Sequence, residues 1–313
     1  MQYALTAMLF FILVIAPINS EAATMEKITF TNEGAELVGV LYLPENYEKG
    51  TVVPGVVVTG AWTTVKEQMP AVYAKAMAER GFAALTFDFR GWGESADSLK
   101  YLENPARKTS DIKAAAAYLA SRPEVAGPVG GVGVCASSGY MSDAAANNGD
   151  IAAVALVAPW LHDRGLVEAI YGGKESVEGL IQMGRDAEKG DAPVIMEAAS
   201  AVNEQSLMYQ APYYTEPERG LIPEYDNKFN VASWEGWLTY DALKTADVQD
   251  TPVLLVTSES SALPAGAKAY MERMGDGVKA VWLDGVTQFD FYDRPDAVTA
   301  SADAAAAHFR DNM

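Results

Sequence analysis

The segment GVGVCASSGY (131–140) decides the fold, because it joins the end of a buried strand to a turn made of small residues. The apolar run 128–134 is typical of a strand that is covered on both faces. A helix is expected to begin near Ala136, directly after it. A strand that enters a helix through so short a turn is the usual place for a nucleophile in an open parallel sheet.

Cys135 fits the position of that nucleophile. The strained backbone of such a turn brings strand and helix close together, so the residues two before and two after the nucleophile must be small. Gly133 and Ser137 satisfy this condition around Cys135. A second register is also sterically allowed, with Ser137 as the nucleophile between Cys135 and Gly139. The strand ends naturally before Cys135, which favours the first register.

Strands and helices alternate on both sides of this segment. The predicted strands are 28–32, 35–44, 52–60, 82–89, 128–134, 151–160, 251–258 and 279–284, and the predicted helices include 65–80, 109–122, 264–274 and 295–312. This alternation implies a mostly parallel sheet of about eight strands with helices on both faces. Residues 161–245 break the pattern and are too many for one loop, so we expect a mainly helical cap inserted between core segments 23–160 and 246–313.

The composition excludes several classes of function. The 313 residues include 23 Lys and Arg against 42 Asp and Glu, a net charge of −19, which repels nucleic acids and anionic membranes. One cysteine and two histidines cannot form an internal disulfide or a four-ligand Cys/His metal cluster. We therefore expect no metal and no cofactor, and a small molecule as the partner. The sequence does not indicate an oligomeric state.

The N-terminus is typical of a secretory signal peptide. Residues 4–16 are almost wholly apolar, and Ser20 and Ala22 are spaced as signal peptidase prefers. The stretch is too short to span a bilayer, so residues 1–22 are expected to be removed, leaving no stable membrane span. Such a protein would be secreted or periplasmic. If Met25 is the true start, it would be cytoplasmic.

Three motifs together resemble the α/β-hydrolase superfamily: the turn GVCAS (133–137), the segment DFRGWGES (88–95) and the segment TGAWTTVKEQMP (59–70). Within that superfamily the chain looks like the dienelactone hydrolase and X-prolyl-peptidase-like branch, and the resemblance runs from about Glu26 to the C-terminus. It implies an α/β-hydrolase fold. It also implies hydrolysis of an ester, lactone or related acyl bond through an acyl-enzyme.

The resemblance implies two further parts of the site. An oxyanion hole would be formed by the backbone N–H of Ala136 and by that of Ala61 or Trp62, both aimed where negative charge develops on the carbonyl oxygen. Glu259 follows the strand 251–258, at the position of the acid that orients the catalytic imidazole.

The catalytic histidine of the superfamily should follow the last strand, and Gln288 stands there. An amide cannot accept a proton at neutral pH, so Gln288 cannot be the general base. His308 lies near the end of the terminal helix and is expected to be structural. His162 follows the strand 151–160 at the catalytic edge of the sheet and is therefore the remaining candidate base.

Neighbouring polar residues extend this candidate site. Asp163 is adjacent to His162 and is a candidate partner for its imidazole. Asp290 and Tyr292 lie close to Gln288 in sequence and are candidate substrate contacts, although packing of the loop is an alternative role for both.

Three mechanisms remain open. In the first, His162 assists Cys135 and is oriented by Glu259 or Asp163. In the second, the Cys135 thiol reacts without an imidazole, helped by the N-terminus of the following helix. In the third, catalysis is impaired and the protein binds a small molecule under an aromatic cap. The cap aromatics that suit a pocket are Tyr209, Tyr213, Tyr214, Tyr225, Trp234 and Trp237, and at least half of them are expected to form the core of the cap.

Overall fold

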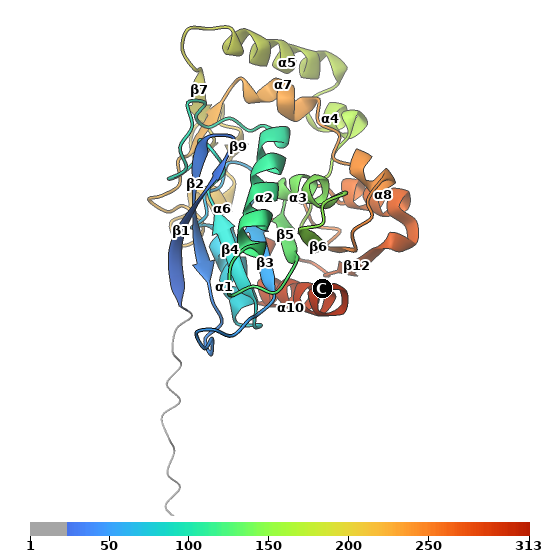
Figure 1. Ribbon diagram of the computed structural model, residues 1–313. Coiled ribbons are helices and arrows are strands. Elements are labelled where there is room, and N and C mark those ends of the chain that lie inside the picture. The colour runs from blue at the N-terminus through green and yellow to red at the C-terminus, as the bar shows by residue number, and fades with distance from the viewer. Residues whose placement is uncertain (1–23) are drawn as a thin grey trace, which may run out of the picture.

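The central feature of the protein is one eight-stranded sheet, seen in a computed structural model that describes residues 24–313 (Figure 1). The predicted signal segment 1–22 lies outside the described residues. In spatial order the strands are β1 (Met25–Asn32), β2 (Ala35–Tyr42), β4 (Ala83–Phe87), β3 (Gly55–Thr59), β5 (Val129–Val134), β6 (Ile151–Val157), β11 (Val253–Thr257) and β12 (Val278–Trp282). The predicted sheet of about eight mostly parallel strands is confirmed.

The sheet is parallel wherever its strands are buried on both faces. All residues of β3, β4 and β5 are buried, as β-branched and small side chains covered by helices on both sides should be. Only β1 and β2 run antiparallel to their neighbours. They form a hairpin whose turn residues, Glu33 and Gly34, both have positive φ.

Helices cover both faces of the sheet (Figure 1). On one face lie α2 (Pro105–Ala120), α3 (Ser137–Ala145) and α8 (Pro264–Met274), and on the other lie α1 (Met69–Ala78), the short α9 (Asp290–Asp293) and α10 (Pro295–Asn312). Helices from both faces pack closely against β5. A side chain on Gly131 would clash with Met141 of α3, and one on Gly130 would clash with Phe309 of α10. The sheet core therefore leaves no space at these glycines.

Helix α1 begins four residues later than the sequence predicts. The residues before it form a loop in which Lys66 and Gln68 are buried. The Lys66 ammonium contacts Asp88 and Glu94, each at 2.8 Å, and the Gln68 amide donates to the carbonyl of Gly220. These tertiary contacts hold the loop after β3 in place.

Residues 161–245 form a layer beyond the carboxyl ends of the parallel strands. The elements are α4 (Arg164–Ile170), α5 (Lys174–Glu188), β7 (Ile195–Glu197), β8 (Ala199–Ser200), β9 (Met208–Tyr209), α6 (Pro212–Thr215), β10 (Lys228–Asn230), α7 (Ser233–Leu238) and the 3-10 helix η1 (Lys244–Asp247). Helices α5 and α7 lie against each other at the top of Figure 1. The short pairs β7–β10 and β8–β9 were not indicated by the sequence pattern.

The remaining short element is the 3-10 helix η2 (Gly275–Gly277), which connects α8 to β12. No helix between residues 24 and 313 is long and apolar enough to cross a membrane.

Candidate active site

Cys135 directly follows the last residue of β5, and only Ala136 separates it from the first residue of α3. Its φ is +58°, a left-handed conformation that costs a residue with a side chain about 1–3 kcal/mol and that is enriched at functional sites. Its N–H donates to Val157 on β6, at 2.9 Å, and its carbonyl accepts from Ser138 on α3, at 3.0 Å. These bonds hold the strained turn.

The register that makes Cys135 the turn residue fits this geometry better than the alternative. Ser137 is already the first residue of α3, and its buried hydroxyl donates to the carbonyl of Gly60. Gly133 must be small, because a Cβ there would lie 2.6 Å from the carbonyl oxygen of Ser137 and 2.9 Å from the Cα of Ser138. The structure therefore shows the expected close approach of β5 to α3. The Ser137 hydroxyl connects α3 to the loop after β3 by its hydrogen bond to Gly60.

Cys135 lies in the wall of a cavity of about 560 Å³. The lining residues are Trp62, Cys135, Ala136, Trp160, Ile170, Tyr171, Leu207, Met208, Tyr209, Gln210, Ala211, Tyr214, Trp237, Ala262, Gln288, Phe289 and Tyr292. Eight of these lining residues are aromatic, and none of them is Asp, Glu, Lys, Arg or His. The cavity therefore suits an uncharged, largely apolar ligand.

Hydrogen-bond donors act on the sulfur of Cys135. Burial raises the pKa of the thiol, and the Tyr292 hydroxyl and the backbone N–H groups of Ala136 and Trp62 oppose that rise. The N–H of Ala61 points instead to the sulfur of Met69, at 3.5 Å. Of the two candidates in the loop after β3, Trp62 is therefore the one whose N–H faces Cys135.

Gln288, which the resemblance puts at the position of the superfamily's histidine, is held by three hydrogen bonds. Its Oε1 accepts from the N–H of Ala262 at 2.9 Å, and its Nε2 donates to the carbonyl of Ala158 at 2.9 Å and to the hydroxyl of Tyr292 at 3.0 Å. Tyr292, expected as a substrate contact, and Gln288, expected as a pocket residue, both line the cavity.

His162 is not placed to act as the base. Its Nδ1 accepts from the indole N–H of Trp160 at 2.9 Å, and its Nε2 lies 3.1 Å from the carbonyl of Trp237 and donates to it. Burial lowers the pKa of the imidazole to about 4, so the ring is neutral and has no free lone pair. Trp160 and Trp237 line the cavity. The imidazole does not line it; it is fully buried and hydrogen-bonds to both tryptophans.

Three carboxylates expected at the site serve other purposes. Glu259 is exposed and forms an ion pair with Lys268 at 2.7 Å, so it is not the acid of a triad. Asp163 accepts from the N–H of Leu166 at 3.0 Å and thereby caps α4. Asp290 accepts the N–H and the hydroxyl of Thr287, at 2.8 and 2.7 Å, and closes the turn before α9.

The second histidine and the aromatic cluster also have defined places. His308 contacts the carbonyl of Pro252 at 3.2 Å, in line with its expected structural role. Half of the six aromatic residues singled out in the inserted segment line the cavity, namely Tyr209, Tyr214 and Trp237. The other half, Tyr213, Tyr225 and Trp234, are buried in packing.

A buried polar network that the sequence did not reveal supports the loop after β3 that carries Trp62. Glu103 forms a 2.8 Å ion pair with Lys108, accepts from the Tyr140 hydroxyl of α3 at 2.8 Å, and accepts from the N–H of Thr63 at 3.4 Å. Thr63 follows Trp62 and also has a positive φ of 63°. One carboxylate thus joins the helix after Cys135 to the loop that carries the second N–H donor.

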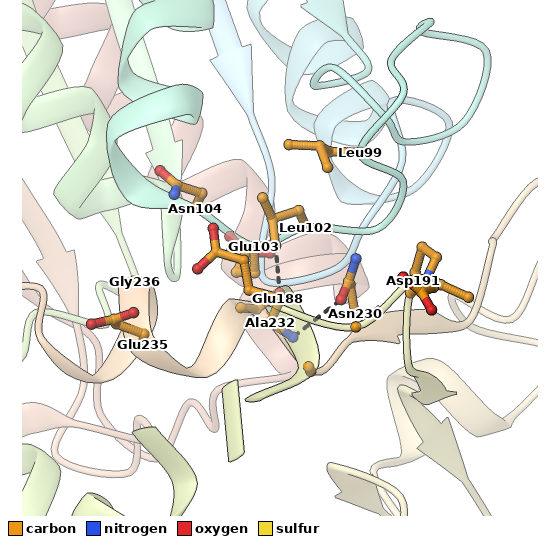
Figure 2. A pocket seen from close by; sticks show the side chains of 15 residues that line it. Leu99, Leu102, Glu103, Asn104, Glu188, Asp191, Asn230, Ala232, Glu235 and Gly236 are labelled. Carbon is orange, nitrogen blue, oxygen red and sulfur yellow. Dashed lines mark hydrogen bonds between the residues drawn. The ribbon is translucent and has the colours of Figure 1, made fainter. Parts of the chain in front are cut away.

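A second cavity, of about 350 Å³, lies between the chain before α2 and the ends of α5 and α7 (Figure 2). Its lining includes the carboxylates of Glu188, Asp191 and Glu235, but the side chain of Glu103 turns inward to Lys108. Within residues 24–313, no group of three or more His, Cys, Asp and Glu side chains is arranged to hold a metal ion.

Comparison with known proteins agrees with this architecture. A model of the alpha/beta hydrolase family matches residues 53–302. The uncharacterized protein YcjY of Escherichia coli K12 is 27% identical over 309 residues, which cover 92% of this chain and 99% of that protein. The crystal structure of the hypothetical protein PA2218 from Pseudomonas aeruginosa has a TM-score of 0.82 at 24% identity, covering 98% of this chain and all of that one. A dienelactone hydrolase from Anabaena variabilis shares the fold more distantly, with a TM-score of 0.56 at 14% identity over 93% of this chain and 99% of that one.

Proposed function

Because the chain belongs to the alpha/beta hydrolase family, we propose that it hydrolyses an ester, lactone or related acyl bond of an uncharged small molecule through a thioester on Cys135. The observation that carries the proposal is the strained Cys135 in the cavity wall, with the N–H groups of Ala136 and Trp62 facing its sulfur. Two such donors stabilise the oxyanion of an acyl transfer by about 3 kcal/mol each.

The reaction has two steps. The Cys135 sulfur bonds to the carbonyl carbon, the bond from that carbon to the leaving oxygen breaks, and the thiol proton ends on the leaving group. Water then attacks the thioester, one of its protons returns to the sulfur, and the carboxylic acid is released. Because neither histidine faces the sulfur, the attacking water has no imidazole to accept its proton, and we expect the second step to be slow.

The substrate class follows from the lining of the cavity. A carboxylate on the substrate would lose its hydration without gaining a cation, since the described lining residues carry no charge and the chain has a net charge of −19. Nine of the seventeen lining residues come from residues 161–245, so this segment acts as a cap that selects apolar acyl groups. Tyr171 and Gln210 supply polar contacts within it.

A second candidate function is binding of a small molecule without turnover. It is favoured by one observation: Gln288 holds the position of the base, and its amide cannot accept a proton. In that case the donors around Cys135 would bind a carbonyl or an anionic oxygen of a ligand that leaves unchanged.

Steady-state hydrolysis decides between the two functions. We expect turnover of p-nitrophenyl butyrate and no turnover by Cys135→Ala under the same conditions. The matched substrate p-nitrophenyl hemisuccinate, which adds a carboxylate at the end of the acyl chain, should react at least tenfold more slowly. Equal rates for wild type and Cys135→Ala would refute the thioester mechanism. A thermal shift with butyrate esters but without turnover would support the binding function.

A further inference from the structure

We propose that Tyr292 is a catalytic residue that donates a hydrogen bond to the Cys135 sulfur in place of an imidazole, and that Gln288 is the positioning residue that sets the direction of this hydrogen bond. The inference deepens the proposed function and rests on it for the catalytic role. The hydrogen bond itself can be tested without any substrate.

The direction of the bond follows from the backbone around Gln288. Its Oε1 faces the N–H of Ala262 and its Nε2 faces the carbonyl of Ala158, each at 2.9 Å. A flipped amide would place donor against donor and acceptor against acceptor, so the orientation is fixed. The Nε2 group must then donate to the Tyr292 oxygen, 3.0 Å away.

The hydroxyl proton of Tyr292 is consequently free for another acceptor. The oxygen already receives the Gln288 amide proton, and Cys135 and Tyr292 line the same cavity, so we assign the hydroxyl proton to the sulfur, which also acts on the pKa of Tyr292. The ring cannot turn away easily, because it packs edge-to-face against Tyr213 and Phe289, with centroid distances of 5.0 and 5.7 Å. The hydrogen-bonded chain therefore runs from Gln288 through Tyr292 to the sulfur.

The donor role also follows from the electrostatics of the cavity. Burial and the adjacent Cys135 raise the pKa of Tyr292 well above its ordinary value, so the hydroxyl keeps its proton at neutral pH. Burial also raises the pKa of Tyr140, Tyr171 and Tyr214, and the charge of a Cys135 thiolate adds a smaller contribution to each. Of these four tyrosines, Tyr292 is the one whose hydroxyl lowers the pKa of the Cys135 thiol. It stabilises the thiolate during attack and again when the thioester breaks.

The experiment measures the pKa of the thiol directly. Cys135 is the only cysteine in the chain, so the rate of alkylation by iodoacetamide across a pH series reports this group alone. In Tyr292→Phe, which keeps the ring, we expect the thiol pKa to rise by about one unit, because a hydrogen bond to a charged group is lost. Below the pKa, alkylation at a fixed pH should then slow about tenfold.

Two further variants complete the test. Gln288→Met cannot donate to Tyr292 and adds no charge, so the hydroxyl proton is no longer directed to the sulfur and the thiol pKa should rise; this variant decides if Tyr292→Phe does not fold. The control is Tyr209→Phe, which removes a lining hydroxyl that bonds to Gln210 and should leave the profile unchanged. A Gln288→Met or folded Tyr292→Phe profile that superimposes on wild type would overturn the proposal. An equal shift in Tyr209→Phe would do the same.

Discussion

The buried imidazole of His162 predicts a specific loss of stability in mild acid. In the folded protein the pKa of this group falls to about 4 from an ordinary value of 6.5. Between these pH values the unfolded chain binds a proton that the folded chain does not, so the free energy of unfolding falls as the pH drops from 6.5 to 4. At 1.36 kcal/mol per unit, the full effect is about 3 kcal/mol.

His162→Gln isolates this contribution. Its side chain does not titrate, and its amide can still donate to the carbonyl of Trp237. Urea unfolding of both proteins at several pH values gives the difference in free energy. We expect the wild type to be more stable above pH 6.5 and to lose up to about 3 kcal/mol relative to His162→Gln by pH 4. A difference that stays constant with pH would refute the assignment of His162 as a neutral structural residue.

Three other substitutions probe the site. Gly133→Ala should destabilise the fold by about 1–3 kcal/mol in urea unfolding and abolish ester turnover, because the new methyl would meet the backbone of α3. Glu103→Gln should cost about 3–5 kcal/mol by leaving the Lys108 charge buried without its partner, and adding Lys108→Met should restore part of this loss. Tyr171→Phe, which removes a hydroxyl from the cavity lining, should raise KM several-fold with little change in kcat; a reduced kcat at constant KM would contradict a binding role.

The sheet and the turn could be predicted because both depend on local patterns. Buried parallel strands are continuous apolar runs, and the close approach at Gly133 requires small residues within a few positions. The resemblance to the α/β-hydrolase superfamily located Gln288 and Tyr292 beside the nucleophile for the same reason, since both follow the last strand of the sheet.

The direction of individual side chains could not be predicted in this way. His162 and Glu259 both follow strands at the catalytic edge, yet one is buried behind Trp160 and Trp237 and the other is exposed beside Lys268. Which way each side chain points depends on partners that the sequence pattern does not identify.

The support of the loop after β3 was missed for a related reason. Thr63 and Tyr140 lie 40 and 37 residues from Glu103 in sequence, on opposite sides of it, and the three meet only in the folded protein. No local motif marks them, and a buried carboxylate is recognised only when its partners are seen.

The central claim is that the acyl group passes through Cys135, and intact-mass analysis tests it most directly. Wild type and Cys135→Ser are mixed with p-nitrophenyl butyrate and quenched in acid. We predict a single butyryl adduct on wild type that peptide mapping assigns to Cys135, accumulating because no imidazole assists the attacking water. Cys135→Ser should carry no adduct, since a serine hydroxyl without a base is a poor nucleophile. Release of p-nitrophenol by wild type without an adduct, or at equal rates by both proteins, would contradict the account.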